Sequence, residues 1–476
     1  MTPSAPRSRL LAALVGCMLI SSSCASGADA PAEPSVVTPD PFLFGTEAIL
    51  NTNNPGLTTA IDTIDNAFQV TTVKMRFRPT ARKPTGDGFE VVAVLPNGQS
   101  LDLDDVAGRC QEHGYSLVPM ISFAAGGVVT TAVIDDYVDF VDWFVNRYAT
   151  SMKLTLIELY NNPGMDFGGT NAQLLELNNK TYDRVKSAHP DLLVATPGFE
   201  YWQEVDPGAT PPPSLPRVVS QVEYFLDVAN GARFDVWAFH GYQSLGTAPG
   251  GARYFYAPTY TTTVNKYAGV TGILEVRKAL DDNGWQQRAI MDLEHTGLVV
   301  PGLPLDPNLD AVDEAYLAQD LILKRSLKVG ASLAAAGLIA LKLYPRSNLG
   351  EFAFGSLNAD GSRSRAVVSM GVALRALHDT KAVAHVSGEF GRDDVAWVER
   401  FGRGTDDVFA LFKPFKATHG VQLALDGESL VVSLALPRLP KDVVLTSADG
   451  TTQALTPSTE LVVEAVNSPR YVDVNY

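Results

Sequence analysis

Polar residues end several apolar segments of the chain, and the segment LIELYNNPG (156–164) raises the sharpest question about its chemistry. This segment has the form of a buried strand that ends in two amides, Asn161 and Asn162, followed by a proline. A carboxyl group at such a strand end could give or take a proton, whereas an amide only binds a ligand through hydrogen bonds. A later segment, IMDLEHTG (290–297), does carry carboxylates, at Asp292 and Glu294. The chemistry open to the chain therefore depends on whether these segments meet.

Eight apolar segments that could form strands alternate with helical stretches between residues 42 and 345. They are FLFGTEAIL (42–50), TTVKMRFRP (71–79), YSLVPMISF (115–123), LTLIELYNN (154–162), LLVATPGFE (192–200), FDVWAFHGY (234–242), AIMDLEHTG (289–297) and GLIALKLYP (337–345). Eight β/α units in one run predict a closed (β/α)8 TIM barrel. An open doubly wound sheet is the alternative, but it would need a glycine-rich phosphate turn after the first strand, and GTEAILNTNNPG (45–56) is a poor one.

The C-terminal ends of barrel strands converge on one mouth, so polar residues at those ends are the first functional candidates. Alternation along each strand predicts which side chains share a face: Glu158, Tyr160 and Asn162; Ala238, His240 and Tyr242; Asp292 and Glu294. We therefore expect polar groups to gather at one rim of the barrel.

After residue 378 the pattern changes to strands alone, with Asp426-Gly427 and Asp449-Gly450 as hairpin turns. This pattern predicts a small all-β sandwich. The expected organisation is an export signal (1–24), a Pro/Ala-rich tether (25–41), the barrel (42–377) and the β-sandwich (378–476).

The N-terminus has the form of a bacterial export signal, because Arg7 and Arg9 precede an uncharged apolar run, Leu10 to Ile20. Two cysteines compete as lipidation sites. Cys17 has the better preceding tripeptide, whereas Cys24 follows an apolar region of full length, and we favour Cys24. Plain secretion is the alternative. The expected location is the bacterial cell envelope, through a lipid anchor, or the extracellular space.

Charge and composition exclude several classes of function. The net charge of −16, from 53 acidic and 37 basic residues, disfavours nucleic acid as a partner, and contact with a membrane is expected only through the lipid anchor. Beyond the leader only Cys110 would accompany Cys24, which leaves no disulfide framework. The sequence has no GxSxG turn, HExxH pattern or CxxC pair, so we expect neither a nucleophilic serine nor a metal or other cofactor.

Several segments together resemble the clan A glycoside hydrolases, which are retaining enzymes on (β/α)8 barrels. IELYNNP resembles the strand-four signature WEIWNEP, FDVWAFHGY the strand-six pattern that closes in His-x-Tyr, IMDLEHTG the strand-seven segment of the nucleophile, and TVKMRFRP the arginine-bearing second strand. The terminal sandwich, with NSPRYVDV near its end, is similar to the accessory domain of family 39. The order and spacing of the motifs along the chain carry the resemblance.

The resemblance implies a role for each matching residue. Glu294 would be the nucleophile, and Arg76 would keep it ionised. Asn161 would bind the sugar 2-hydroxyl, and His240 with Tyr242 would support the mouth. A retaining glycosidase also needs a second carboxyl group, about 5 to 5.5 Å from the first, to donate a proton. Here Asn162 occupies that acid/base position, and an amide cannot donate the proton.

Three explanations of this departure stay open. The proton donor has moved, with Asp166, Glu200 and Glu47 as the nearest candidates by topology. Or the leaving group needs no proton, as in the plant thioglucosidases of the same clan. Or catalysis is lost, and the protein is a glycan-binding pseudo-glycosidase. We therefore predict an exported glycoside hydrolase-like protein that acts on or binds a carbohydrate. A barrel that serves only as an interaction platform is a third, weaker hypothesis.

Each candidate residue also has a purely structural interpretation. Glu294 could be a carboxylate paired with Arg76, His240 a packing histidine, and Glu158 a buried hydrogen-bonded partner inside the barrel. The aromatic residues that could form sugar-stacking walls are Trp202, Tyr242, Tyr254, Tyr256 and Tyr344. For any single one of them, core packing is the simpler interpretation.

Overall fold

The computed structural model describes most of the chain after residue 41. The described residues are 42–51, 56–83, 86, 88–94, 100–122, 129–160, 167, 169–200, 231–241, 246–247, 253–254, 269–282, 284–286, 288–295, 307–329, 332–346, 355–415 and 425–476. The expected export signal and tether, with Cys17 and Cys24, lie outside them.

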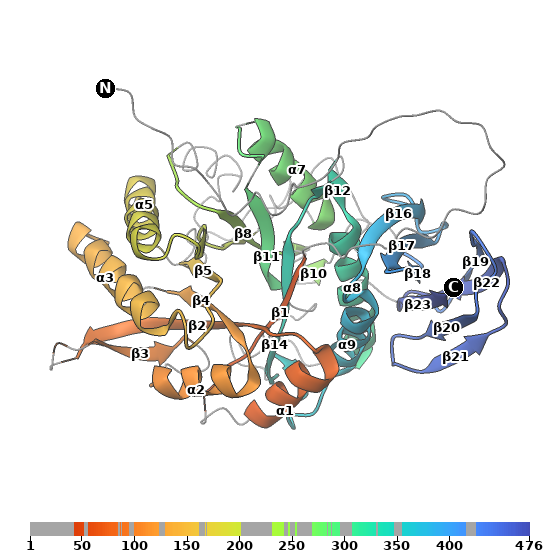
Figure 1. The fold of residues 1–476 in the computed structure, drawn as a ribbon, viewed down its shortest axis with the longest axis horizontal. Coiled ribbons are helices and arrows are strands. Elements are labelled where there is room, and N and C mark those ends of the chain that lie inside the picture. The colour runs from red at the N-terminus through yellow and green to blue at the C-terminus, as the bar shows by residue number, and fades with distance from the viewer. Residues whose placement is uncertain are drawn as a thin grey trace.

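Eight parallel strands close into a barrel, one at each of the predicted segments, and only β2 extends beyond its segment (Figure 1). They are β1 (Leu43–Glu47), β2 (Thr72–Arg82), β4 (Ser116–Ile121), β5 (Leu156–Leu159), β6 (Leu193–Ala195), β8 (Val236–His240), β11 (Ala289–His295) and β14 (Gly337–Pro345). Neighbouring strands pair in chain order, and β1 closes the ring by pairing with both β2 and β14. The predicted (β/α)8 barrel is confirmed.

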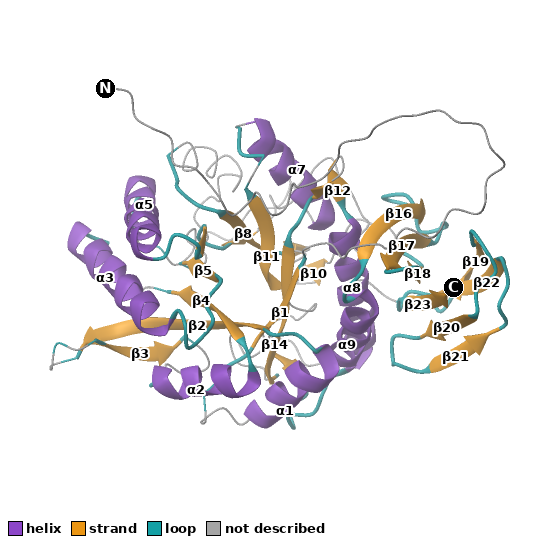
Figure 2. Cartoon of the chain, in the orientation of Figure 1, coloured by secondary structure: helices purple, strands orange, loops and turns teal. Residues whose placement is uncertain are grey.

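Helices surround the barrel on its outer side (Figure 2). They are α1 (Leu57–Asp62), the π-helical segment η2 (Thr63–Phe68), α2 (Leu103–His113), α3 (Thr131–Tyr148), α5 (Asn171–Ala188), α7 (Gly269–Asp282), α8 (Pro307–Ser326) and α9 (Arg365–Leu377). Local sequence sets several of their starts. Thr170 caps α5 in a capping box with Gln173, and the Thr130 side chain accepts a hydrogen bond from the Val133 amide of α3.

The strands are apolar on both faces because they pack inward on one another and outward on the helices. Residues from six strands form the interior cluster: Val118, Leu156, Ala195, Val236, Ala238, Met291, Leu293 and Ile339. Their neighbours along the strands, such as Phe77 of β2, pack outward against Phe140 and Phe144 of α3. Toward the strands' C-terminal ends the inward positions become charged, and the functional candidates begin there.

Short strands extend the barrel sheet and decorate its connections. β3 (Phe89–Ala93), which the sequence did not suggest as a strand, pairs antiparallel with the outer half of β2. β7 (Phe199–Glu200) pairs with β8, and β15 (Gly355–Leu357) pairs with β14. The remaining pairs are β9 (Gly246–Thr247) with β10 (Arg253–Tyr254), and β12 (Lys328–Val329) with β13 (Ser332–Leu333).

The C-terminal region is all β, as predicted. A six-stranded sheet has the order β16 (Lys381–Ser387), β17 (Trp397–Arg403), β18 (Asp406–Phe412), β23 (Arg470–Asn475), β20 (Asp442–Thr446) and β21 (Thr452–Leu455). A second pair, β19 (Leu430–Ala435) and β22 (Glu460–Ala465), packs on it through a separate apolar core. The Asp449-Gly450 turn joins β20 to β21, with Gly450 at a φ of 86° that favours glycine.

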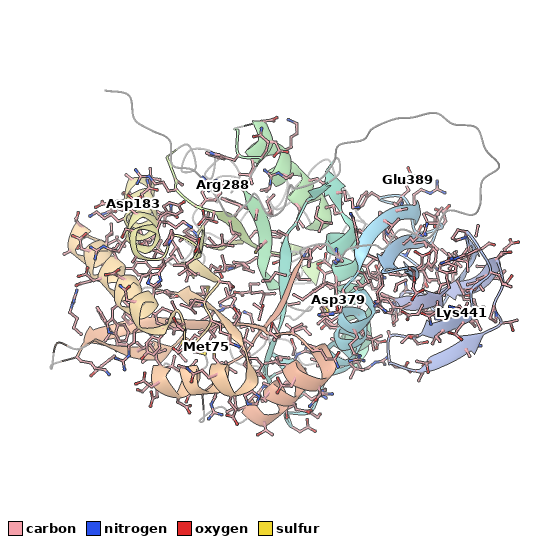
Figure 3. All side chains as sticks on the ribbon, viewed as in Figure 1. Met75, Asp183, Arg288, Asp379, Glu389 and Lys441 are labelled. Atoms are coloured by element: carbon pink, nitrogen blue, oxygen red, sulfur yellow. The ribbon has the colours of Figure 1, made fainter. Side chains whose placement is uncertain are left out.

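The other face of this sheet packs against the barrel. Trp397, Phe401 and Phe412 belong to the same hydrophobic core as helices α8 and α9. The buried Gln319 amide of α8 donates to the carbonyls of Lys413 and Asn467. Figure 3 shows side chains throughout both regions, with Met75 buried on β2 and Asp183 and Lys441 exposed at the periphery. None of the helices in the described ranges is long and apolar enough to span a bilayer.

Candidate active site

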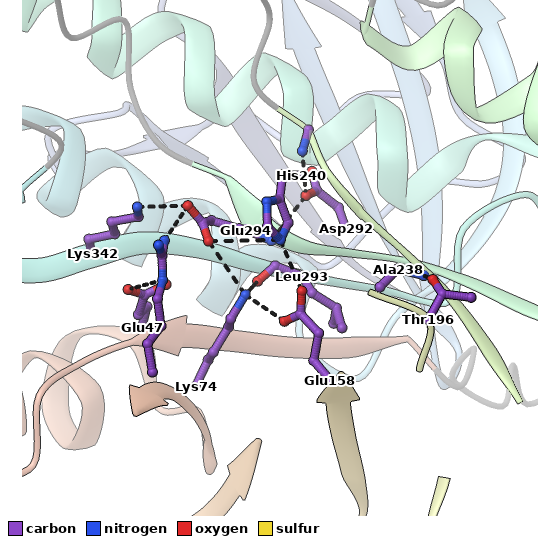
Figure 4. Close-up of polar contacts among 12 residues, drawn as sticks. Glu47, Lys74, Glu158, Thr196, Ala238, His240, Asp292, Leu293, Glu294 and Lys342 are labelled. Atoms are coloured by element: carbon purple, nitrogen blue, oxygen red, sulfur yellow. Dashed lines mark hydrogen bonds and ion pairs between the residues drawn. The ribbon is translucent and has the colours of Figure 1, made fainter. Parts of the chain in front are cut away.

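A cluster of buried charged residues occupies the inside of the barrel near the C-terminal ends of its strands (Figure 4). We call it the charged cluster, and its members are Glu47, Lys74, Arg76, Glu158, His240, Glu294 and Lys342. Each of these residues is at most 5% exposed. Three carboxylates therefore face three permanent cations and one imidazole in a region that excludes water.

Glu294, near the end of β11, lies at the centre of the cluster. Its Oε1 atom forms an ion pair with Arg76 and another with Lys342 Nζ at 2.7 Å. Among the described residues its Oε2 atom has no hydrogen-bond partner, and the nearest cationic groups there are Lys74 Nζ at 3.6 Å and His240 Nε2 at 3.8 Å. One oxygen of the carboxylate is thus held in place, while the other has no hydrogen bond to break before it reacts or binds.

Neighbouring cations keep this carboxylate ionised. Burial alone would raise the pKa of Glu294, but the field of Arg76 and Lys342, with smaller contributions from His240 and Lys74, holds the pKa well below the usual glutamate range. A buried carboxylate with a strongly shifted pKa at a barrel mouth is a candidate functional group. Arg76 is the arginine that the sequence resemblance expects to keep the nucleophile ionised, and that role stays a prediction.

Glu158 is the second carboxylate close to Glu294. Its Oε2 lies 2.7 Å from Lys74 Nζ, and its Oε1 lies 2.9 Å from His240 Nε2. Because Lys74 contacts both carboxylates, Oε2 of Glu158 and Oε2 of Glu294 are at most about 6.3 Å apart, the sum of the two Lys74 distances. Burial raises the pKa of Glu158, but Lys74 and His240 reverse the effect and lower it. These contacts favour the ionised form of Glu158, and the residue is buried and hydrogen-bonded inside the barrel, as predicted.

Irregular backbone turns two of the cluster side chains, Lys342 and Glu294, inward. In β14, Leu341 has a φ of 68°, and the register with β1 shifts between Gly45 and Glu47. Simple alternation from the inward Ile339 would send Lys342 outward, but this irregularity directs its ammonium group to Glu294. Non-glycine residues in the left-handed region are strained, and such strain concentrates at functional sites.

A second irregularity overturns one expectation about β11. Alternation predicted that Asp292 and Glu294 share a face, but the register with β14 shifts between Asp292 and His295. Asp292 instead forms an ion pair with Lys324 of the outer helix α8, at 2.6 Å, and accepts a hydrogen bond from the Gly241 amide at 2.9 Å. Asp292 therefore fixes the ends of β8 and β11, whereas Glu294 points into the barrel.

Two glycines leave room for these contacts. A Cβ atom on Gly198 would collide with His240 Nε2 and Glu158 Oε1, and one on Gly241 would collide with the Asp292 carboxylate. No side chain larger than hydrogen fits at either position unless the buried pairs separate. The glycines are thus required by close approach and not by turn geometry.

The structure brings together Arg76, His240 and Glu294 from the predicted site. Glu47, one of the predicted alternative proton donors, lies beside them, with its Oε1 3.1 Å from Arg76 Nε. The Tyr344 side chain is 1% exposed in the structure. Its role as a sugar-stacking wall stays a prediction. The backbone of Glu200 pairs in register with His240. The predicted site residues outside the described ranges are Asn161, Asn162, Asp166, Trp202 and Tyr242.

Sequence reasoning missed Lys74 and Lys342. A signal existed for Lys74, because it shares a strand face with Arg76 in TVKMRFRP. Lys342 is the only charge within the apolar segment GLIALKLYP, and an isolated charge in a buried strand implies a partner. Within the part of the chain that the structure describes, no group of His, Cys, Asp and Glu side chains could hold a metal ion.

Comparison with solved structures relates this fold to glycoside hydrolases. A family 39 glycoside hydrolase from Bacteroides cellulosilyticus WH2 superposes with a TM-score of 0.61 at 16% identity, over 92% of this chain and 81% of that chain. A glucosidase from Croceicoccus marinus gives 0.60 at 16% identity, over 93% and 97%. A monomeric β-xylosidase from Caulobacter crescentus CB15 gives 0.59 at 13% identity, over 93% and 98%.

The sequence itself matches no protein-family model and no curated protein. At such low identity the structural matches establish the fold and not the activity. The resemblance to the barrel-plus-sandwich architecture of clan A, and of family 39 in particular, is confirmed at that level.

Proposed function

We propose that the protein is a glycoside hydrolase-like enzyme that acts on a glycan or glycoside by a retaining mechanism, with Glu294 as nucleophile. The observation that carries this proposal is the state of the Glu294 carboxylate. It lies at the C-terminal end of the seventh barrel strand with its pKa held low, its Oε1 is held by Arg76 and Lys342, and its Oε2 has no hydrogen-bond partner in the part of the chain that the structure describes. A carboxylate of this kind suits attack on an anomeric carbon.

In the first step Glu294 Oε2 would bond to the anomeric carbon as the bond from that carbon to the leaving oxygen breaks, giving a covalent glycosyl ester. Water would then cleave the ester, regenerate the carboxylate and release the sugar with its anomeric configuration retained. Arg76 and Lys342 would contribute by fixing the attacking group before the substrate arrives, which lowers the entropic part of the barrier.

The leaving oxygen must take a proton or depart as an anion. Glu158 and Glu47 are poor donors, because each carboxylate is ion-paired inside the barrel. Glu200 is favoured among the relocated candidates, since its backbone lies beside His240 at the C-terminal end of the fifth-strand segment. The donor is therefore atypical or relocated in this proposal.

A non-catalytic glycan-binding protein is the second candidate, and two observations favour it. Asn162 stands where the family resemblance expects the acid/base residue. Glu294 is only 3% exposed and compensated by several cations, which would also suit a purely structural or binding role.

Aryl glycosides separate these candidates, because a nitrophenolate leaves without protonation. If the protein is an enzyme, a panel of 4-nitrophenyl glycosides should include at least one that is hydrolysed, with release of nitrophenolate measured by absorbance. Alkyl glycosides of the same sugar need a proton on the leaving oxygen. This protein should hydrolyse them roughly 10² to 10⁴ times more slowly than a glycosidase with a complete acid/base pair does. Absence of turnover across the panel, together with saturable oligosaccharide binding, would support the binding protein instead.

We also propose that the chain is exported and anchored through a lipid on Cys24. The support is the basic N-terminus with Arg7 and Arg9, the apolar run and the cysteine that follows it. Cys24→Ser should move the protein from the membrane fraction to the soluble fraction of the cell envelope, and Cys17→Ser is the matched control that should not. Retention of the Cys24→Ser chain in membranes would contradict the anchor.

A further inference from the structure

Strand β2 places a third cation, Arg78, on the same face as Lys74 and Arg76. The register of β2 with β4 is regular from Thr72 to Phe77, and the register with β3 is regular from Phe77 to Pro79. Alternation therefore holds through this part of the strand, and Arg78 follows Arg76 by about 6.6 Å toward the C-terminal end, at a rise of about 3.3 Å per residue. Arg78 thus lies at the mouth side of the charged cluster.

The Arg78 side chain differs from the other basic side chains of β2 because it has no partner among the described residues. Lys74 and Arg76 form ion pairs with Glu158, Glu47 and Glu294. Farther along β2, Arg82 forms ion pairs with Asp136 and Asp139 of α3. Among the described residues, the Arg78 side chain makes neither a hydrogen bond nor an ion pair, and its Nε atom is excluded from solvent.

Burial of an unpaired guanidinium costs free energy, and it is unexpected in a chain with an excess of acidic residues. A buried polar group without a partner loses its hydrogen bonds to water and forms none with the protein. The protein has 53 acidic residues to supply a partner and only 37 basic ones. The cluster beneath Arg78 is balanced, with Lys74, Arg76 and Lys342 against three glutamates, so Arg78 adds an uncompensated positive charge at the mouth.

We infer that Arg78 binds an anionic group of the ligand, next to the sugar that Glu294 would contact. This inference rests on the proposed carbohydrate function and specifies its substrate class: a glycan that carries an oxyanion, either a hexuronate carboxylate or a sulfate ester. The planar guanidinium donates two parallel hydrogen bonds to such a group. The net charge of −16 would repel a densely charged polymer, so a sparsely charged glycan fits better.

Binding measured by calorimetry on the full chain tests this inference without depending on turnover. The probes are three oligosaccharides of one backbone: neutral, with a hexuronate, and with a sulfate ester. We expect the wild type to bind at least one anionic form about 10- to 100-fold more tightly than the neutral form, as for a charged hydrogen bond. Whichever anionic form is preferred identifies the group.

Arg78→Gln should remove that preference and leave the affinity for the neutral probe unchanged. The matched control is Arg82→Gln, on the same strand but 53% exposed and ion-paired, which should keep the preference. If Arg78→Gln does not fold, Arg78→Lys decides, since it keeps the charge but loses the bidentate fork. A weaker preference in Arg78→Lys supports the inference, and an unchanged one overturns it.

Two results would separate this inference from the proposed function. Equal binding of neutral and anionic probes by the wild type would overturn the role of Arg78 and leave a carbohydrate function standing. Binding of none of a broad set of neutral and anionic oligosaccharides, with no turnover of aryl glycosides, would overturn both.

Discussion

Replacement of Glu294 by glutamine is expected to reduce the turnover of 4-nitrophenyl glycosides by roughly 10³ or more, the scale seen when a covalent nucleophile is removed from other hydrolases. The amide has nearly the same shape but cannot form the glycosyl ester. Turnover of the wild type should also persist on the acidic side of the ordinary glutamate range, because Arg76 and Lys342 hold the pKa of this carboxyl well below it. Initial rates of both chains from pH 3 to 8 measure the two effects.

The same substitution also has a structural cost that must be separated from catalysis. Loss of the Glu294 charge leaves Arg76 and Lys342 with uncompensated buried charge, and removal of one partner of a buried ion pair costs about 3–5 kcal/mol. Glu158→Gln is the matched control. It also removes a buried carboxylate, from Lys74 and His240, but leaves the nucleophile intact.

The two variants should therefore show comparable losses of thermal stability, with covalent labelling lost only in Glu294→Gln. An activated 2-deoxy-2-fluoro glycoside, which slows ester hydrolysis, should add one glycosyl mass to the wild type and to Glu158→Gln, with the label on Glu294 by peptide mass spectrometry. A label on another carboxylate, or undiminished turnover in Glu294→Gln, would refute the assignment of the nucleophile.

The barrel was predictable because its signal is repeated eight times. Each strand is a short apolar run, and each connection returns the chain to the end of the barrel where the next parallel strand starts. An error in the predicted bounds of one element therefore does not change the predicted architecture. The hairpin of β2 with β3 was harder to predict, since β2 continues beyond the barrel to Arg82 and its partner Phe89–Ala93 breaks the β/α alternation. Such an excursion has no periodic counterpart elsewhere in the sequence.

The site was predictable only where strands remain regular. Alternation correctly placed His240 inward, as the continuation of Val236 and Ala238. It failed for Asp292 and Glu294, because the register of β11 shifts between Asp292 and His295. It would also fail at Lys342, because β14 is irregular before that residue. A bulge reverses the direction of every later side chain, and no residue type in GLIALKLYP announces it. Family resemblance singled out Glu294 and Arg76, which the structure places together in the charged cluster, whereas strand periodicity alone did not.

Replacement of Asn162 by glutamate is expected to raise the hydrolysis of alkyl glycosides by roughly 10² to 10⁴, the usual value of general acid catalysis. An alkoxide is a poor leaving group and needs the proton that an amide cannot give. Hydrolysis of 4-nitrophenyl glycosides of the same sugar should change far less in its first step, because nitrophenolate departs unprotonated. The measurement is the ratio of kcat/KM for the two leaving groups in the wild type and the variant.

Asn162→Gln is the control for this experiment, since it has the length of glutamate without an ionisable proton and should leave the ratio unchanged. A large rise in the ratio of alkyl to aryl turnover for glutamate alone would show that a missing proton donor limits the wild type. A folded Asn162→Glu chain with no gain would mean that the donor has already been replaced elsewhere or that catalysis is absent. Glu200→Gln then distinguishes these two cases, because the loss of a relocated donor would slow alkyl glycosides selectively, whereas a binding protein would show no turnover to lose.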